Sequence, residues 1–177
     1  QVGKVIVGLS NLLRDSLNNT VSQLTLREDI RYTENYLLIQ KFRFGDKFEY
    51  RFDIQPECLD CIVPKRIIQP IVENALEYGS DLGSVFRVDV KAFFREGDLI
   101  IVIEDDGKGI APERLHEIRD ILGRRKNNSI HNGMYNVHRR IGLIYGERYG
   151  LQIDSTPGRG TCITMALPIR MEAERRT

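Results

Sequence analysis

The sequence predicts an α/β sandwich, in which one mixed sheet of about five strands carries helices on one face, preceded by an N-terminal helical hairpin. Three observations predict this fold. Two stretches with helical spacing open the chain, short apolar or alternating stretches typical of strands recur between residues 48 and 168, and segments with helical spacing lie between them. A chain of 177 residues is long enough for one well-buried core.

The first 45 residues predict two helices. Apolar residues of the first helix recur at intervals of three and four, at Ile6, Leu9, Leu13, Leu17, Val21 and Leu24. Thr25 and Glu28 form a capping box for a second helix, which we expect to end at Gly45. We interpret residues 1–45 as a helical stalk and partial dimerisation region, because the apolar stripe of the first helix needs a partner to cover it.

Residues 46–170 have the pattern of a globular domain. Strands are expected at residues 48–54, 86–92, 99–103, 149–155 and 161–168. The third strand is apolar throughout and is expected to be covered on both faces, and a hairpin turn joins it to the second. Helices are expected at residues 64–79, 112–122 and 133–145, the first of them with Pro64 in its first turn. The polar residues 123–132 form the predicted mobile lid, and the tail, residues 171–177, is expected to fray after Pro168.

The composition excludes several classes of function. Basic and acidic residues nearly balance, 26 against 25, so we expect no nucleic-acid partner. No apolar stretch approaches the roughly 20 residues that span a bilayer. Three cysteines, an odd number, argue against a disulfide framework. Cys58 and Cys61 have zinc or redox spacing, but without a second such pair we interpret them as ordinary, partly buried thiols.

Separate segments carry the residue types that an ATP pocket needs. In "IEDDGKGI", residues 103–110, Asp105 ends a buried strand and would present its carboxylate to the cavity beside it. Gly107 and Gly109 let the backbone pass close to a ligand. Taken alone, this segment is equally consistent with an ordinary turn. A calcium-binding loop is disfavoured, because the segment interrupts the spacing of ligands that such a loop needs.

The other parts of such a pocket are spread along the chain. Asn74 offers a side-chain carbonyl that Mg²⁺ accepts alongside phosphate oxygens and waters. Gly133 begins a helix whose free N–H groups can receive phosphate. A tight turn containing Gly158 and Gly160 leads into the last strand at Thr161.

Four segments together resemble a known family. "PIVENALEYG", "IEDDGKGI", "GMYNVHRRI" and "GRGT" resemble, in order and spacing, the N, G1, G2 and G3 boxes of two-component sensor histidine kinases. Upstream, "REDIRYTENYLLIQKFRFGDKFEYRFDI" is similar to the LytS/YesM branch of that family. The resemblance covers nearly all of residues 7–168. It implies the ATP-binding fold shared with gyrase and the heat-shock chaperone.

The resemblance also implies roles for individual residues. Asn74 would bind Mg²⁺, Asp105 would accept a hydrogen bond from the adenine amino group, and Tyr78 would lie against the base. The lid would be framed by Gly107, Gly109 and Gly133, and the adenine end would be supported by Thr161. Glu73 and Asn74 are the candidate catalytic residues, with ATP and Mg²⁺ as cofactors.

The same resemblance implies partners and a location. We expect a response regulator as the partner and a homodimer formed through the N-terminal helices. The phosphoacceptor histidine of the branch, which precedes "LSNLLR" in relatives, does not occur in this sequence, so the acceptor helix is expected to lie outside the fragment. We expect the fragment to be cytoplasmic and the full-length protein to be anchored at the cytoplasmic side of the cell membrane.

Two positions depart from the family pattern and keep alternatives open. Glu77 stands where most relatives have lysine, and His131 replaces the first glycine of the second glycine box. These departures favour, as an alternative, a degenerate ATP-binding and dimerisation module without kinase activity. A gyrase-type ATPase is a weaker alternative, because Pro70 occupies the position of the water-activating glutamate, and Glu73 points about 100° away from Asn74 around the helix.

Overall fold

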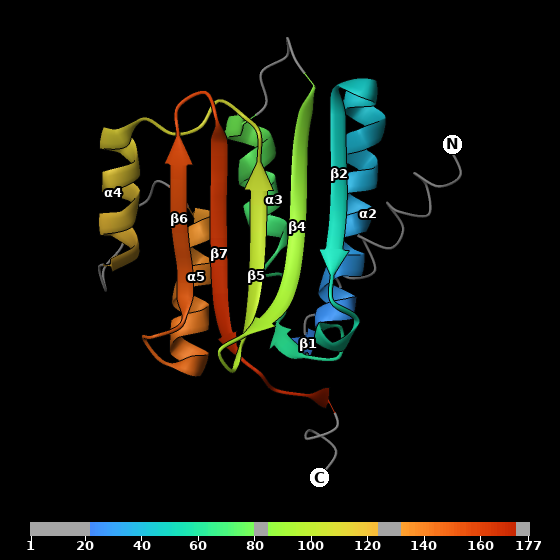
Figure 1. Ribbon diagram of the computed structural model, residues 1–177, viewed down its shortest axis with the longest axis vertical. Coiled ribbons are helices and arrows are strands. Elements are labelled where there is room, and N and C mark those ends of the chain that lie inside the picture. The colour runs from blue at the N-terminus through green and yellow to red at the C-terminus, as the bar shows by residue number, and fades with distance from the viewer. Residues whose placement is uncertain (1–21, 80–84, 124–131, 173–177) are drawn as a thin grey trace.

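A five-stranded mixed sheet forms one layer of the molecule. The computed structural model describes residues 22–79, 85–123 and 132–172. The strand order is β2-β4-β5-β7-β6 (Figure 1), in which β2 and β4 are parallel and the other neighbours are antiparallel. The strands are β2 (Phe48–Ile54), β4 (Phe86–Arg95), β5 (Asp98–Asp105), β6 (Gly150–Thr156) and β7 (Gly160–Pro168). The predicted fold class is confirmed.

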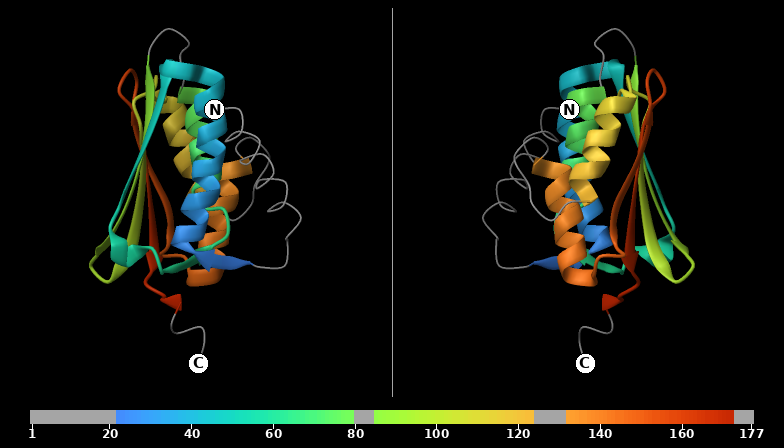
Figure 2. Two further views of the ribbon diagram at one scale, coloured as in Figure 1. Left: turned by 90° about the vertical axis from the view of Figure 1, so that its right-hand side faces the viewer. Right: turned by 90° about the vertical axis from the view of Figure 1, so that its left-hand side faces the viewer.

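The described helices form the second layer and all lie on the same face of the sheet, as the two side views in Figure 2 show. They are α2 (Leu26–Phe44), α3 (Gln69–Asn74), α4 (Pro112–Gly123) and α5 (Asn132–Tyr145). A π-helical turn, η3 (Ala75–Gly79), continues α3. None of the helices in the described ranges is long and apolar enough to cross a membrane. The predicted lid, residues 123–132, lies almost entirely outside the described residues.

The central strand β5 is buried on both faces, as predicted, but for two different reasons. Leu99, Ile101 and Ile103 belong to the core shared with the helices. Ile100 and Val102, which alternate with them, lie on the other face of the strand, and they are still only 4% and 9% exposed. Neighbouring strands supply the cover there: Ile100 stands between Phe93 and Ala166 in the ladder. A strand with neighbours on both sides can therefore be apolar throughout without a second helical layer.

Helix α2 confirms its predicted ends but not its predicted place. The Thr25 hydroxyl accepts from the Glu28 backbone N–H at 3.3 Å, the Glu28 carboxylate accepts from the Thr25 N–H at 2.9 Å, and the helix ends at Gly45. However, Leu26 and Leu37 are completely buried in the same core as the sheet. The prediction that this helix stands apart as a stalk was wrong, because its apolar face packs inside the domain.

Two short strands account for two further corrections. Leu24, expected to end the first helix, lies in β1 (Gln23–Thr25), which pairs with β3 (Ile62–Pro64). Pro64 therefore ends a strand instead of starting a helix, and α3 begins at Gln69 with Pro70 in its first turn. Both prolines suit a first helical turn, so only the pairing with β1 distinguishes them. The rest of the predicted first helix, residues 1–21, lies outside the described residues.

The chain after β7 is held in place further than predicted. Ile62 donates its N–H to the Arg170 carbonyl at 2.6 Å, and Glu172 donates to the Asp60 carbonyl at 3.0 Å. Met171 also lies against Cys61, with the two sulfurs 3.6 Å apart. Fraying directly after Pro168 was thus a wrong prediction, since residues 170–172 pair with residues 60–62 at the start of β3.

Cys58 and Cys61 match the interpretation as ordinary thiols. Both are buried, and burial raises the pKa of each thiol to about 11, so neither is a thiolate at neutral pH. Within the described residues, no group of three or more histidine, cysteine or acidic side chains is arranged to hold a metal ion.

Candidate functional site

A largely apolar cavity of about 330 Å³ lies between the helices and the end of the sheet. Four of the predicted site residues, Asn74, Asp105, Gly109 and Thr161, line it although they come from three separate segments. The remaining lining residues are Ile71, Ala75, Ile103, Lys108, Ile110, Ala111, Arg114, Ile118, Met134, Ile153 and Ile163. The size and the few polar groups among apolar walls are typical of a small-molecule pocket.

Asp105 places a carboxylate at the end of the central strand. In the ladder it stands between Val88 and Thr161, and its Oδ1 accepts from the Gly107 N–H at 3.0 Å. Burial raises the pKa of this carboxyl to about 6, although hydrogen bonds from the Gly107 and Thr161 backbones oppose the rise. An acceptor that is partly desolvated in this way favours a ligand that brings its own hydrogen-bond donor.

A hydroxyl network supports the same end of the cavity. Thr161 Oγ1 lies 2.9 Å from Ser155 Oγ, which accepts from the Ile110 N–H at 2.9 Å and donates to the Gly160 carbonyl at 2.8 Å. Sequence reasoning missed Ser155. It stands opposite Thr161 in the β6–β7 ladder, so the register of that hairpin was the signal that could have found it.

Two glycines close this end by direct backbone contact. Gly109 has φ +67°, and a Cβ there would lie 2.1 Å from the Thr156 carbonyl oxygen. Gly160 has φ +92°, and its Cβ would lie 1.8 Å from the Asp105 carbonyl oxygen. The G1 and G3 segments are thus pressed together backbone to backbone, which only glycine allows at these two positions.

Asn74 lies on the opposite wall, at the end of α3. Its Nδ2 donates to the Pro70 carbonyl at 2.8 Å, which leaves the side-chain carbonyl as the group to meet a cation. Gly133, at the beginning of α5, lies against it, since a Cβ there would be 3.2 Å from Asn74 Nδ2 and 3.4 Å from Pro70 Cβ. The G2 box and the N box therefore contact each other directly.

The other predicted residues lie at or beyond the edge of this cavity. Gly107 reaches it only through its backbone N–H, which donates to Asp105. Glu73 does not line the cavity, and its carboxylate accepts from Gln69 Nε2 at 2.8 Å. The Tyr78 side chain and His131 lie outside the described part of the chain. The apolar lining residues were not predicted as site residues, because an apolar residue gives no sign of which cavity it faces. Two charged lining residues, Lys108 and Arg114, were not predicted either.

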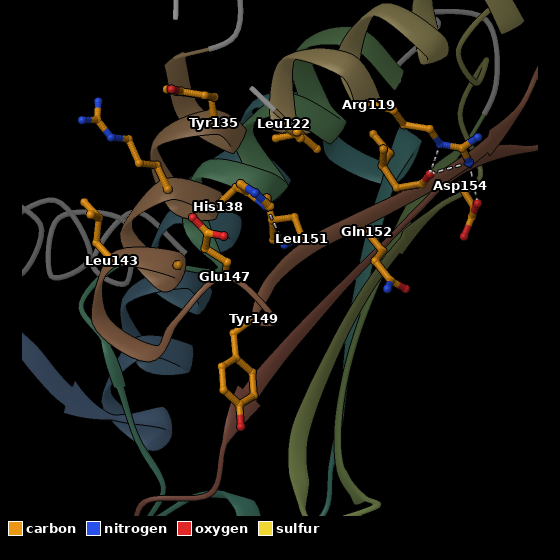
Figure 3. Close-up of a pocket in the computed structure, with 14 residues that line it drawn as sticks. Arg119, Leu122, Tyr135, His138, Leu143, Glu147, Tyr149, Leu151, Gln152 and Asp154 are labelled. Carbon is orange, nitrogen blue, oxygen red and sulfur yellow. Dashed lines mark hydrogen bonds and ion pairs between the residues drawn. The ribbon is translucent and has the colours of Figure 1, made fainter. Parts of the chain in front are cut away.

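A second, larger hollow of about 1050 Å³ lies beside edge strand β6, between α4 and α5, and contains none of the predicted site residues (Figure 3). Side chains occupy the free edge of β6: His138 Nδ1 accepts from the Leu151 N–H at 3.0 Å, and Arg119 donates to the Ile153 carbonyl at 2.7 Å. These contacts satisfy groups that an edge strand would otherwise present to another strand.

The bond to His138 predicts a pH dependence of stability. Burial lowers the pKa of His138 below its usual value, and Nδ1 can accept from Leu151 only while it is unprotonated. Because the unfolded chain then binds the proton more tightly, this stabilisation is complete above pH about 6.5 and is lost as the pH falls below it. In thermal unfolding between pH 7.5 and 5.5, His138→Gln should show a smaller loss of Tm than the parent; an equal loss in both would contradict this assignment.

Comparisons with known proteins identify the family to which this chain is similar. Residues 60–171 match the family model described as histidine kinase-, DNA gyrase B-, and HSP90-like ATPase, and residues 1–48 match a histidine kinase model. The chain is 32% identical over 173 residues to sensor histidine kinase YesM of Bacillus subtilis, covering 97% of this chain and 28% of that protein. Sensor protein kinase HptS of Staphylococcus aureus is 28% identical over 165 residues, with coverages of 93% and 32%.

Solved structures show the same fold. The mycobacterial sensor histidine kinase MprB superposes with a TM-score of 0.59 at 21% identity, covering 84% of this chain and 97% of that one. A nucleotide-free catalytic domain of histidine kinase ThkA gives 0.61 at 15% identity, with coverages of 85% and 97%. Since the family model matches more than half of the chain, the chain belongs to the family of histidine kinase-, DNA gyrase B- and HSP90-like ATPases.

Within that family, the chain is similar in sequence to parts of sensor histidine kinases, and its first 48 residues match a histidine kinase model. It spans about a third of the length of the curated relatives it matches.

Proposed function

We propose that this domain transfers the γ-phosphoryl group of Mg–ATP to a histidine on a helix outside this chain. The observation that carries the proposal is the arrangement of one cavity, with the Asp105 carboxylate on one wall and Asn74 on the other. Asp105 would accept from the adenine amino group, and the apolar lining would hold the base. The phosphates would then extend toward Asn74 and the beginning of α5, where helix N–H groups favour anions.

Magnesium fits this site as an ion that the protein and the nucleotide would bind together. The described residues contain no cluster of three metal-binding side chains, so a cation here takes most of its ligands from phosphate oxygens and water. Mg²⁺ often binds in this way, and here the Asn74 side-chain carbonyl would be its protein ligand. Its contribution would be to neutralise charge on the phosphates.

The chain's own residues would act by positioning. Asp105 and the Ser155–Thr161 hydroxyl pair fix the adenine end, and the contact of Gly133 with Asn74 fixes the metal end. Phosphoryl transfer needs little more from the protein than this alignment and charge neutralisation. The candidate role of Glu73 next to Asn74 would be through the electrostatics of the same helix turn, since its carboxylate is hydrogen-bonded to Gln69.

The partners follow from the same proposal. The family of sensor kinases implies a two-component system, so a response regulator would receive the phosphoryl group from the acceptor histidine. We propose that the protein is a homodimer through its N-terminal residues and that the full-length protein is anchored at the cytoplasmic side of the membrane. Helix α2 lies against the ATP-binding core, so dimer contacts would come from residues ahead of it.

A transfer assay tests this function. The chain is incubated with Mg–ATP and a separately supplied helix fragment that carries the phosphoacceptor histidine of the branch, and phosphohistidine is measured as an acid-labile product. We expect phosphorylation of the fragment by the parent chain and none by Asn74→Ala. Absence of ATP binding at millimolar concentration would contradict the proposal, and ATP binding without transfer would favour the degenerate module. Release of free phosphate without the fragment would favour a gyrase-type ATPase.

Glu77 provides a separate prediction. Its exposed side chain lies in η3, one helical turn after Asn74. A negative charge there would oppose the phosphates of a bound nucleotide. We expect Glu77→Lys to tighten Mg–ATP binding by about two- to tenfold in calorimetric titration, because the charge changes sign near the triphosphate. The gain should shrink at high salt, which screens an exposed charge. Unchanged or weaker binding would show that Glu77 does not limit affinity.

A further inference from the structure

Asp29 of α2 is a completely buried carboxylate that the nucleotide cavity does not use. Its oxygens accept three successive backbone N–H groups from the loop between β3 and α3. Arg66 donates to Oδ1 at 2.5 Å, and Ile67 and Ile68 donate to Oδ2 at 3.2 and 3.1 Å. The pKa of Asp29 is raised to about 6 by burial, against the effect of these bonds, so the carboxylate is charged at pH 7.5 and above. Burying a charge is unfavourable, and the compensation at this site comes from three backbone donors and from the positive charge of Arg140.

The loop that Asp29 holds has an unusual backbone and a second anchor. Arg66 has φ +57°, in the left-handed region that non-glycine residues seldom adopt. From the other side, Arg140 of α5 donates its Nη2 to the Arg66 carbonyl at 2.9 Å. The loop is therefore fixed by a carboxylate from α2 at its N–H groups and by a guanidinium from α5 at a carbonyl.

The held loop leads directly into the Asn74 helix. Ile71 and Val72 both donate their N–H groups to the Ile68 carbonyl, at 3.0 and 3.1 Å, so the last residue bound by Asp29 begins the hydrogen bonding of α3. The same first turn of α3 carries Pro70, whose carbonyl accepts from Asn74 Nδ2 at 2.8 Å. Three hydrogen-bonded steps thus connect the Asp29 carboxylate to the Asn74 side-chain amide.

We propose that Asp29 is a positioning residue of the nucleotide site, which fixes the start of α3 and thereby the Asn74 side chain. Asp29 lies in the segment that matches the histidine kinase model, and Asn74 lies in the segment that matches the ATPase model. The carboxylate therefore joins the two, and the metal end of the site depends on α2. This inference rests on the proposed role of Asn74 toward Mg–ATP.

The test separates the metal end from the adenine end. ATP affinity is measured by calorimetry at pH 8 with Mg²⁺ and with EDTA, and the ratio of the two is the gain due to magnesium. Asp29→Asn has the same shape, but its amide NH₂ cannot accept, so the loop loses acceptors. We expect this variant to lose about tenfold or more of the magnesium gain, while affinity in EDTA changes by less than about twofold. Asn74→Ala should reproduce this pattern.

Thr33→Val is the matched control. Thr33 is equally buried on the same helix, but its hydroxyl donates within α2, to the Asp29 carbonyl at 3.0 Å, and not to the loop. We expect this variant to keep the parent's magnesium gain whatever its effect on Tm. If Asp29→Asn does not fold, Arg140→Gln replaces it, with an expected loss of about threefold because it removes the loop's other anchor.

The outcomes distinguish the two proposals. A parental magnesium gain in Asp29→Asn or its replacement overturns the positioning role, as does an equal weakening with and without magnesium, which indicates general loosening. A parent chain that binds ATP with no magnesium gain overturns instead the proposed role of Asn74.

Discussion

Replacing Asp105 with asparagine is expected to weaken ATP binding by about ten- to hundredfold, the effect of losing a charge-assisted hydrogen bond of roughly 1.5 to 3 kcal/mol. Asp106→Asn is the matched control. It is the adjacent carboxylate, but its Oδ1 accepts from the Arg87 N–H at 2.7 Å, and it does not line the cavity. We expect its ATP affinity, measured by calorimetry, to stay within about twofold of the parent. Normal ATP binding by Asp105→Asn would exclude the adenine role.

Asp105→Asn is expected to weaken ATP binding but not to destabilise the folded chain at neutral pH. The folded-state pKa of Asp105, about 6, lies above the value of 3.8 for an unperturbed carboxyl, so the folded chain binds the proton more tightly than the unfolded chain. Stability from this group is complete below pH 3.8 and is lost as the pH rises through about 6. At pH 7.5 the Asn variant should therefore melt at or above the parent's Tm, and this difference should narrow at pH 5. A lower Tm at pH 7.5 would contradict this account.

Gly160→Ala is expected to have the largest structural effect. The new Cβ would lie 1.8 Å from the Asp105 carbonyl oxygen. Strands β5 and β7 are paired at this point, so they cannot separate there without moving Asp105. We expect a loss of unfolding free energy of about 3 kcal/mol or more, as for other severe overpacking with backbone strain, together with loss of ATP binding.

Gly158→Ala, two residues away in the same turn, is the control for backbone strain alone. Gly158 also has a positive φ, +73°, but nothing lies within 4 Å of a Cβ placed there. Its expected cost is only about 1 to 2 kcal/mol, that of a left-handed non-glycine residue. Denaturant unfolding of the two variants measures the difference. Equal destabilisation would show that contact with Asp105 is not what requires glycine at position 160.

The candidate site could be predicted only as far as its residues lie in local motifs. Asn74, Asp105, Gly109 and Thr161 each sit in a recognisable segment, and the structure brings all four to one cavity. Ser155 could not be predicted, because a serine in an alternating strand gives no indication of its partner until the hairpin register is known. The functional roles of the four residues are predictions for the experiments above.

The sequence by itself determined the features of this protein that depend on neighbours in the chain. The five strands of the sheet, the β4–β5 hairpin and the capping box of α2 all follow from patterns that span a few residues. Only the tertiary structure decided that α2 packs into the core and that Pro64 ends a strand. It also decided that Asp29 binds amides 37 to 39 residues away. The physical reason is range: spacing and capping act within one or two turns, whereas three-residue strands and a buried carboxylate are stabilised only by partners that folding brings to them.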